Sequence, residues 1–454
     1  MMTYRIKRIL ILAVASFLLT GFAISPAHAA LSDHFVTTWK TDNYGQSNNT
    51  SITVPMVGGP YDVDWDNDGT FDEFWLVGPV THDFGVAGTY TIRIKGIYDS
   101  IRFENTGDKQ KILSLDQWGT SSWTTMYRAF TGCSNLEITA TDTPDFSAVT
   151  DMFAMFQWAS VANPDTSGWD TSAVTNMANM FYKASAANPN TSNWDTSSVR
   201  NMLSMFRDAS AANPDTSGWN TSAVTNMAYM FYQASLANPD TSGWNTSAVT
   251  NMTHMFYSVP SANPDTSGWD TSAVTDMSYM FIGATSANPD TSGWNTSAVT
   301  NMTYMFRRAY AANPNTSGWD TSAVTDMSYM FYEATSANPD TSGWDVSGVV
   351  NMTSMFYNAG LSRSNYEALL VNWNAQALQP GVTFDGGNST YCATAAANAR
   401  ANMINRDGWI ITDGGQDCAG STTPPTAVTN LASSVSASGA RLNGSADPNG
   451  ASTN

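Results

Sequence analysis

A short acidic stretch near the N-terminus has residue types and spacing suited to binding a metal ion. Its carboxylates alternate along the chain and are followed by a glycine and a further aspartate, at Asp64, Asp66, Asp68, Gly69 and Asp72. Alternating carboxylates of this kind converge on one hard cation in the first half of a calcium-binding loop. Trp75 stands where a helix-loop-helix site would have its final glutamate, which disfavours that type of site. We therefore favour a hairpin turn here and keep calcium binding as the alternative.

Residues suited to enzyme chemistry are sparse in the rest of the chain. After the N-terminal segment 1–29 the histidines are His34, His82 and His254, and no two lie close in sequence. The chain has no Cys-x-x-Cys pair, phosphate-binding loop or nucleophile elbow. Aspartates are plentiful, but a glycosidase needs two carboxylates in different environments, whereas near-equivalent aspartates recur here. We therefore predict a protein without catalytic residues and, apart from the calcium alternative, without a cofactor.

The N-terminal segment 1–29 has the layout of a secretory signal. Three basic residues precede an apolar run over residues 9–24 and a small-x-small cleavage motif at 27–29. An uncleaved anchor is the alternative, but the run is short for a span of about 20 residues. Cleavage removes three basic residues and no acidic one, which takes the net charge from −19 to −22 and argues against a nucleic-acid partner. We expect an exported protein, secreted or held at the cell surface, without a transmembrane segment after cleavage.

The three cysteines fit an oxidising compartment. Cys392 and Cys418 could close a loop near the C-terminus as a disulfide, while Cys133 would pack as a small buried thiol.

A single motif recurs every 25 residues, without insertion or deletion, in the middle of the chain. Eight units lie between Phe156 and Phe356, a signature of a solenoid in which each coil buries its apolar face against its neighbours. Within one unit, five apolar residues recur at helical spacing: Val174, Met177, Met180, Phe181 and Ala184. This spacing predicts a short helical turn that begins at about residue 175. The preceding residues 166–171 are compatible with a strand. The expected fold class is therefore an α/β repeat solenoid, with one strand and one helical turn per coil.

Exchanges between the copies indicate which residues face inward. Thr171 and its equivalents are replaced once, by Val346, so this column should point inward and Asp170 outward. The column of Gly168 admits only Asn193, and both residues tolerate positive φ, which suggests a kink or bulge before each tryptophan. Trp169 and its equivalents should stack in the core, with an exposed platform for sugars as the alternative.

The repeat strongly resembles a known bacterial family. Its pattern Trp-Asp-Thr/Val-Ser-x-Val-Thr-Asn-Met-x-x-Met-Phe-x-x-Ala is similar to that of the BspA-like leucine-rich-repeat surface proteins, and the flanking residues 116–136 and 365–415 resemble their ends. The resemblance covers roughly residues 105–418. It implies a curved leucine-rich-repeat-like solenoid and a role in adhesion. Thr166 stands where the family often has an aliphatic residue, which suggests a more polar binding face.

The segments on either side of the repeats resemble extracellular β modules. "YDVDWDNDGTFDE" and "THDFGVAGTYTIRI" resemble a polycystic-kidney-disease-type (PKD-like) all-β sandwich, and the end of the chain resembles the opening strands of a fibronectin type III module. The expected organisation is a signal peptide (1–29), a PKD-like sandwich (30–105), a capping segment (106–155), eight repeats (156–358), a C-terminal cap (359–418), a Pro/Ser/Thr-rich linker (419–428) and an incomplete fibronectin-like module (429–454).

Repetition favours avidity, so we expect a binding protein, an adhesin for extracellular protein or glycan partners. An ice-binding solenoid and a structural spacer are the alternatives, and a polysaccharide hydrolase is a more distant one. The outward aspartates of the repeats are the predicted binding residues: Asp165, Asp170, Asp195, Asp215, Asp240, Asp265, Asp270, Asp290, Asp320, Asp340 and Asp345.

Overall fold

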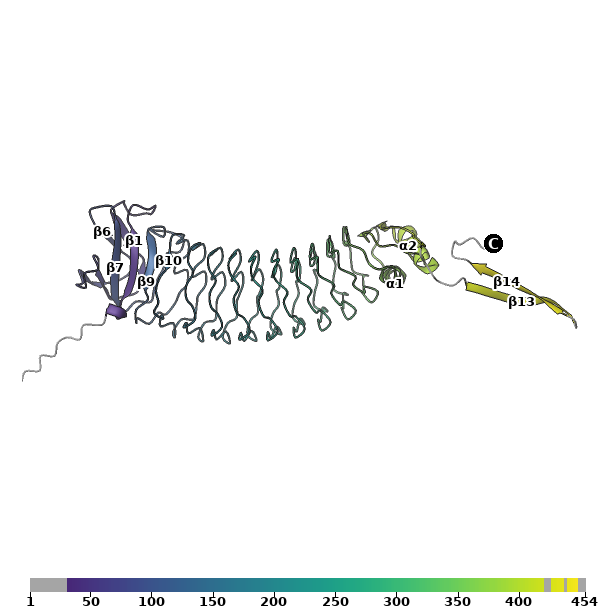
Figure 1. Ribbon diagram of the computed structural model, residues 1–454, viewed down its shortest axis with the longest axis horizontal. Helices are drawn as coiled ribbons and strands as arrows, with labels where there is room; N and C mark the ends of the chain where they lie inside the picture. The colour runs from purple at the N-terminus through teal and green to yellow at the C-terminus, as the bar shows by residue number, and fades with distance from the viewer. Residues whose placement is uncertain (1–30, 420–425, 437–438, 448–454) are drawn as a thin grey trace, which may run out of the picture.

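The computed structural model describes residues 31–419, together with the backbone of 426–436 and 439–447. A compact β unit at the N-terminus continues into a curved stack of coils, which ends in a small helical cap (Figure 1). The predicted signal peptide, most of the linker and the end of the chain from residue 448 lie outside the described residues.

The N-terminal unit is all-β, as expected. A 3-10 turn, η1 (Leu31–Asp33), precedes a six-stranded sheet in the order β10-β9-β1-β7-β4-β5, accompanied by the antiparallel pairs β2–β6 and β3–β8. The strands are β1 (Phe35–Lys40), β2 (Ser51–Val54), β3 (Met56–Val57), β4 (Tyr61–Asp64), β5 (Glu73–Leu76), β6 (Val80–Asp83), β7 (Thr89–Gly96), β8 (Ser100–Ile101), β9 (Ile112–Gln117) and β10 (Glu137–Ile138).

The β unit and the solenoid share one sheet and one core. The sheet extends past residue 105, because β9 pairs with β1 and then, in parallel, with β10 of the following segment. Buried Trp118 contacts both Phe146 and Trp169, which belongs to the first repeat. Backbone pairing of the coil type also begins early, since Met126 N–H donates to Asp151 C=O. The β unit therefore covers the first coil and shields its apolar residues from water.

The predicted helical turn in each repeat is wrong, and so is the α/β fold class. Within the described residues both α-helices lie in the C-terminal cap, and the coils consist of turns and isolated β-bridges. Asn179 and Lys183 have φ of 57° and 59°, in the left-handed region. An α-helix requires φ near −63° at every residue. Two left-handed residues four positions apart therefore break the helix while still returning apolar side chains to the same side, which explains the misleading periodicity.

The backbone hydrogen bonds of each coil run mainly to its neighbours. The N–H groups of Met177, Asn179 and Phe181 donate to carbonyls of the next coil at 2.8–3.0 Å. Locally, Met180 N–H donates to Met177 C=O at 3.2 Å, which closes a tight turn. Parallel bridges between equivalent positions join successive coils from Asp151 to Asn351. One coil therefore satisfies the polar groups of the next, as the solenoid prediction required.

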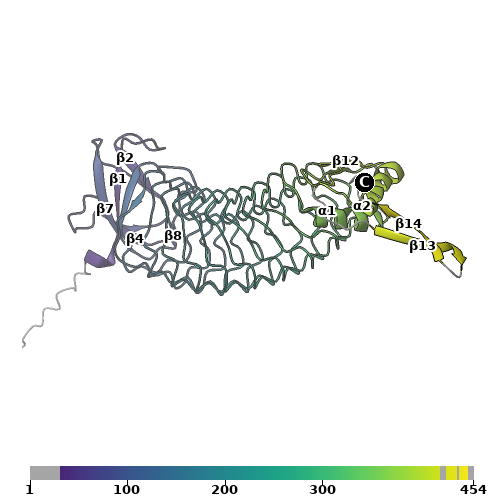
Figure 2. The ribbon, with the colours of Figure 1, turned by 45° about the vertical axis from the view of Figure 1, so that its right-hand side comes forward.

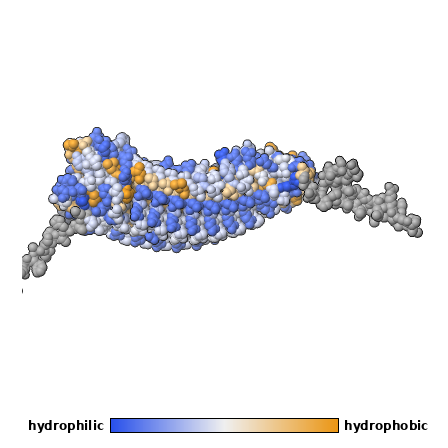
Figure 3. Space-filling model, in the orientation of Figure 1, coloured by the Kyte–Doolittle hydropathy of each residue, from blue (hydrophilic) through white to orange (hydrophobic). Residues whose placement is uncertain are grey.

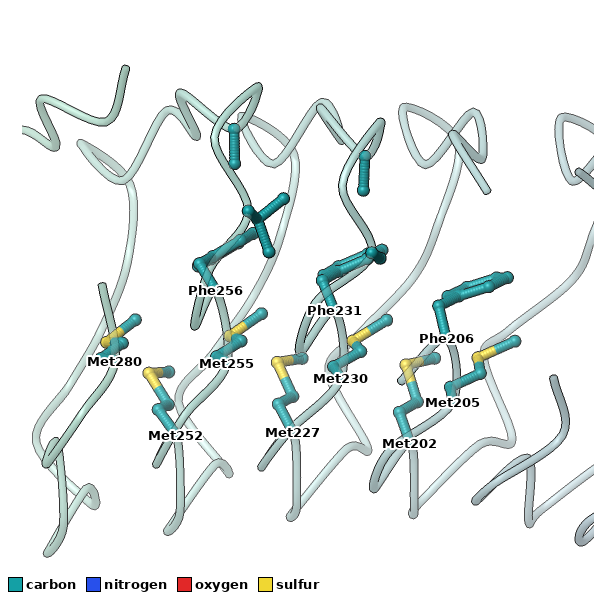
Figure 4. Close-up of a cluster of buried hydrophobic side chains, with 14 of the residues drawn as sticks. Met202, Met205, Phe206, Met227, Met230, Phe231, Met252, Met255, Phe256 and Met280 are labelled. Atoms are coloured by element: carbon teal, nitrogen blue, oxygen red, sulfur yellow. The ribbon is translucent and has the colours of Figure 1, made fainter. Parts of the chain in front are cut away.

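The interior is filled by columns of identical side chains. Each coil contributes two methionines and one phenylalanine, which lie side by side with those of adjacent coils (Figure 4). The five apolar residues predicted to face the core are all fully buried. Trp169 and its equivalents are at most 4% exposed and stack with near-parallel rings, so the core interpretation of the tryptophans is confirmed and the sugar platform is wrong.

Ring spacing shows which side of the coils is concave. Between the same two coils, the ring centroids of Tyr279 and Tyr304 are 4.8 Å apart, and those of Phe281 and Phe306 are 5.5 Å apart. The Trp269 and Trp294 rings are 6.3 Å apart. The coils thus converge toward the tyrosines and diverge toward the tryptophans, so the tyrosines line the inside of the arc that Figures 1 and 2 show.

Two columns of buried threonine hydroxyls also join the coils. Thr166 Oγ1 donates to Asn190 C=O at 2.5 Å and Thr171 Oγ1 to Asp195 C=O at 2.9 Å, and the pattern repeats along the array. The inward position of Thr171 is confirmed. The expectation that Thr166 makes a binding face more polar is wrong, because its side chain is fully buried.

The expected positive φ at Gly168 is also wrong, although the chain does turn there, with Trp169 N–H donating to Thr166 C=O at 3.1 Å. Gly168 and its equivalents have no left-handed φ, and neither does Asn193. A Cβ added at Gly218 would lie 3.5 Å from Ser192 C=O, an ordinary contact, so a side chain is tolerated in this column from Gly218 on. Asn193 uses that space to donate from Nδ2 to Ser167 C=O at 3.3 Å.

The last coil explains the Thr-to-Val exchange. Thr341 Oγ1 is buried without a hydrogen-bond partner, and Val346 replaces the second threonine, because a helix of the cap follows instead of another coil.

We expect Thr341→Val to leave the stability of the protein unchanged or slightly raised. Thr241→Val should lower it by about 1–2 kcal/mol, since Asp265 C=O loses the Thr241 hydroxyl at 2.6 Å. The midpoints of urea unfolding compare the two variants, and equal losses would contradict this account of the columns.

The C-terminal cap takes the place of a further coil. It consists of α1 (Arg363–Asn374), β11 (Thr383–Asp385), α2 (Thr394–Asp407) and β12 (Ile410–Thr412), and β11 pairs in parallel with β12. Trp373 Nε1 donates to Thr341 C=O at 3.0 Å, and Gln376 Nε2 donates to Trp344 C=O at 2.7 Å. The cap thereby satisfies the last coil and covers its apolar end.

The cysteines are placed as expected. Cys392 and Cys418 form a disulfide, and Cys133 is a buried free thiol. Beyond the cap, β13 (Thr426–Ser436) and β14 (Gly439–Asp447) form an antiparallel hairpin in the segment that resembles the opening of a fibronectin type III module.

Candidate functional site

The predicted aspartate columns are exposed but have a local structural role. All eleven aspartates lie on the surface, and the columns of Asp165 and Asp170 flank the tryptophan on the outer part of each coil. In each case Oδ1 accepts from the serine N–H two residues on, as from Ser167 to Asp165 at 3.0 Å. Asn190 caps Ser192 in the same way, at 3.2 Å, which explains why Asp and Asn interchange. The convex side in Figure 3 is correspondingly hydrophilic.

These turns hold the carboxylates in their charged form. Hydrogen bonds from the hydroxyl and the N–H of Ser217 lower the pKa of Asp215, and equivalent bonds do the same along the column. The aspartates are therefore explained as exposed turn residues.

The four aspartates of the predicted calcium turn do not all come together. Asp64, Asp66 and Asp72 each bring one carboxylate oxygen within 4.8 Å of the others. Asp68 lies outside this cluster, and its Oδ1 accepts from Thr70 N–H at 2.6 Å.

A ladder of aromatic rings on the concave side was missed by the sequence analysis. Five half-exposed side chains in consecutive coils stack at ring-centroid distances of 4.4–4.8 Å: Tyr229, His254, Tyr279, Tyr304 and Tyr329. All five have φ of 57–62°. A bulky residue rarely adopts left-handed φ, and other coils place Asn179, Ser204 and Ser354 at this position. Local backbone preference therefore does not account for the aromatic residues.

A second row of rings and arginines runs beside the first. Arg207 lies over the rings of Tyr182, Tyr229 and Tyr232, with its guanidinium carbon 4.8–5.1 Å from their centroids. Arg307 likewise lies 4.9 Å from the Tyr332 ring, and Tyr332 stacks on Tyr357 at 4.8 Å. Of the five basic residues within the repeats, Arg207 and Arg307 are in this row, and Lys183 and Arg308 are in the column next to it.

The stacking determines which parts of the rings a partner can reach. Centroid distances of 4.4–4.8 Å leave no room for another molecule between the rings of the first ladder. Ring edges and hydroxyls are accessible, and a hollow beside them is lined by Tyr279, Tyr304, Thr300, Thr325, Asn301 and Asp326. Burial lowers the pKa of His254 to about 4, so the ladder is uncharged at neutral pH.

Comparing the copies column by column would have found this face. The positions of Asn179 and Tyr182 vary between repeats and lie between the core positions, where helical spacing predicts no specific role. Their variation is not random, because aromatic residues and arginine gather there in neighbouring coils. The missed signal was thus variation within an otherwise repetitive surface.

The fold and this face define a curved repeat-array protein with an aromatic ladder and neighbouring arginines on its concave side. The chain belongs to the family described as "Mycoplasma protein of unknown function, DUF285", whose model matches residues 100–215, 162–269 and 259–373. This match fits a BspA-like repeat surface protein, whereas the leucine-rich-repeat and PKD-like resemblances stay predictions. A search of curated proteins found no match. Neither helix in the described part of the chain is long and apolar enough to cross a membrane.

Proposed function

We propose that this protein is a non-catalytic, exported binding protein that recognises an extracellular protein through its concave face. The observation that carries the proposal is the aromatic ladder of four tyrosines and His254 over five consecutive coils, with Arg207 and Arg307 beside it. Tyrosine and arginine are enriched among the residues that dominate binding energy at protein interfaces. Their rotamers are already fixed by stacking, which reduces the entropy lost on binding.

The geometry favours a protein over a glycan. Sugars bind aromatic side chains chiefly through the ring face, and in the main ladder the faces are covered by neighbouring rings. The alternatives lose support as well. An ice-binding surface should be flat, whereas the array is curved, and a spacer has no need of aromatic residues in a left-handed conformation.

The test uses substitutions that already occur within the array. The chain from residue 30 is assayed by surface plasmon resonance on immobilised extracellular matrix proteins and on a glycan array. We expect the triple variant Tyr279→Ser, Tyr304→Ser and Tyr329→Ser to bind its protein target at least about tenfold more weakly. Serine occupies this column at Ser204 and Ser354, so the fold should be kept.

The matched control changes the outer columns. Asp240→Asn, Asp265→Asn and Asp290→Asn introduce the residue found at Asn190 and Asn315. These changes should alter binding less than about twofold. The reverse result, with loss in the aspartate variant only, would move the binding face to the convex side, and binding to glycans alone would exclude a protein partner.

A further inference from the structure

The loop between β4 and β5 gathers carboxylates at the end of a hairpin. Asp64 is the last residue of β4, and Asp72 directly precedes β5. Asp72 N–H donates to Val63 C=O at 2.9 Å, which fixes the two aspartates on adjacent strands. The loop turns back through Asn67, with φ of 61°, so that Asp66 also contributes an oxygen to the cluster.

A buried oxygen in this cluster lacks a partner. Asp64 is fully buried, and Gly69 N–H donates to its Oδ2 at 2.9 Å, but Oδ1 has no hydrogen-bond partner. Asn67 Oδ1, in the same loop, is also buried and unpartnered. Leaving a carboxylate oxygen unpaired in the interior costs free energy, and such groups in native proteins are normally satisfied by a donor or by a cation.

The cluster concentrates negative charge at the end of the hairpin. None of its three carboxylates forms an ion pair with lysine or arginine in the described part of the chain, although Lys95 pairs with nearby Asp62 at 3.8 Å. Three carboxylates that share a space less than 4.8 Å across repel one another. A hairpin turn alone accounts for Asp68, which caps Thr70, but not for the buried, unpaired Oδ1 of Asp64.

We propose that Asp64, Asp66 and Asp72 bind one Ca²⁺, with the side-chain oxygen of Asn67 available as a further ligand. The donors are all oxygens on a loop with irregular spacing, which suits the flexible, six- to eight-fold coordination of Ca²⁺ better than the strict octahedron of Mg²⁺. Bound Ca²⁺ would tie the loop to the hairpin and order Trp65, which stacks on His82 at 4.3 Å.

Isothermal titration calorimetry of the chelator-treated chain from residue 30 tests the site. We expect one Ca²⁺ per chain, with a dissociation constant of about 1 mM or lower, as in extracellular modules, and weaker binding of Mg²⁺. Asp66→Asn and Asp72→Asn keep the side-chain oxygen and remove one charge each. Each should weaken Ca²⁺ binding at least about tenfold, because affinity depends on the number of charged ligands.

Asp68→Asn is the matched control, with the same chemical change in the same loop. It should change the affinity less than about threefold, since Asp68 lies outside the cluster. The proposal is overturned if the unmodified chain shows no heat up to about 10 mM Ca²⁺. It is equally overturned if Asp66→Asn binds like the unmodified chain, or if Asp68→Asn loses as much affinity as Asp66→Asn. The outcome is independent of the concave face, which none of these variants touches.

Discussion

Phe256→Ala should destabilise the array by about 3–5 kcal/mol. The Phe256 ring is fully buried and stacks between Phe231 and Phe281 at 5.7 and 5.5 Å. Its removal opens a cavity in the middle of the stack and takes a partner from both neighbours. Because each coil contacts only the adjacent ones, the damage should separate the array into two halves that unfold at different denaturant concentrations.

Urea unfolding followed by tryptophan fluorescence, together with limited proteolysis, measures this effect. The control is Phe74→Ala, which removes the same side chain from a site that is 54% exposed and should change stability by less than about 0.5 kcal/mol. New cleavage sites should appear around the coil of Phe256 only in the first variant. If both variants unfold at the same urea concentration, the phenylalanine column does not hold the coils together.

The interior of the solenoid could be predicted because the sequence repeats it eight times. A residue such as Met177, invariant among copies, and an exchange such as Thr171 to Val346 together indicate burial without any knowledge of the backbone. The disulfide between Cys392 and Cys418 and the exposure of Asp170 followed from equally local reasoning. These features depend on the type of each side chain and its environment.

The path of the backbone could not be predicted in the same way. A turn with left-handed residues at Asn179 and Lys183 returns apolar side chains to one side at about the same residue spacing as a helix does. Only the hydrogen bonds distinguish the two, and in the coils these run mainly to residues of the adjacent coil. The pairing of β9 with β10, which fuses the β unit to the first coil, is likewise a tertiary feature without a local signal.

The candidate site was missed because a surface is defined by neighbouring coils together. Tyr279 and Tyr304 belong to successive repeats and lie far apart in sequence, yet their rings stack at 4.8 Å. In a single repeat each is one variable residue. The predicted aspartates, in contrast, recur regularly along the repeats, but their regularity reflects the serine turn that every coil needs.

Asp413→Ala should destabilise the C-terminal cap by about 3–5 kcal/mol, the effect expected when one partner of a buried ion pair is removed. The Asp413 side chain is 1% exposed, and Arg400 Nε lies 2.7 Å from its Oδ2. Tyr366 OH donates to the same oxygen at 2.5 Å, and Gly415 N–H donates to Oδ1 at 3.0 Å. Burial, and then the Asp413 carboxylate, raise the pKa of Tyr366, so its hydroxyl stays protonated and needs this acceptor.

Loss of this network should expose the end of the array. The cap covers Trp344, Val346 and Phe356 of the last coil, and an uncovered coil offers its apolar surface and unpaired backbone to a second molecule. We therefore expect Asp413→Ala to lower the thermal midpoint and to form dimers or larger species in size-exclusion chromatography with light scattering.

The control is Asp417→Ala, which removes an exposed ion pair with Arg363 at 3.5 Å. It should cost at most about 1 kcal/mol of stability and leave the protein monodisperse. Because the disulfide at Cys392 constrains the same segment, reduction should enlarge the difference between the two variants, whereas an equal response would show that the buried carboxylate does not hold the cap on the solenoid.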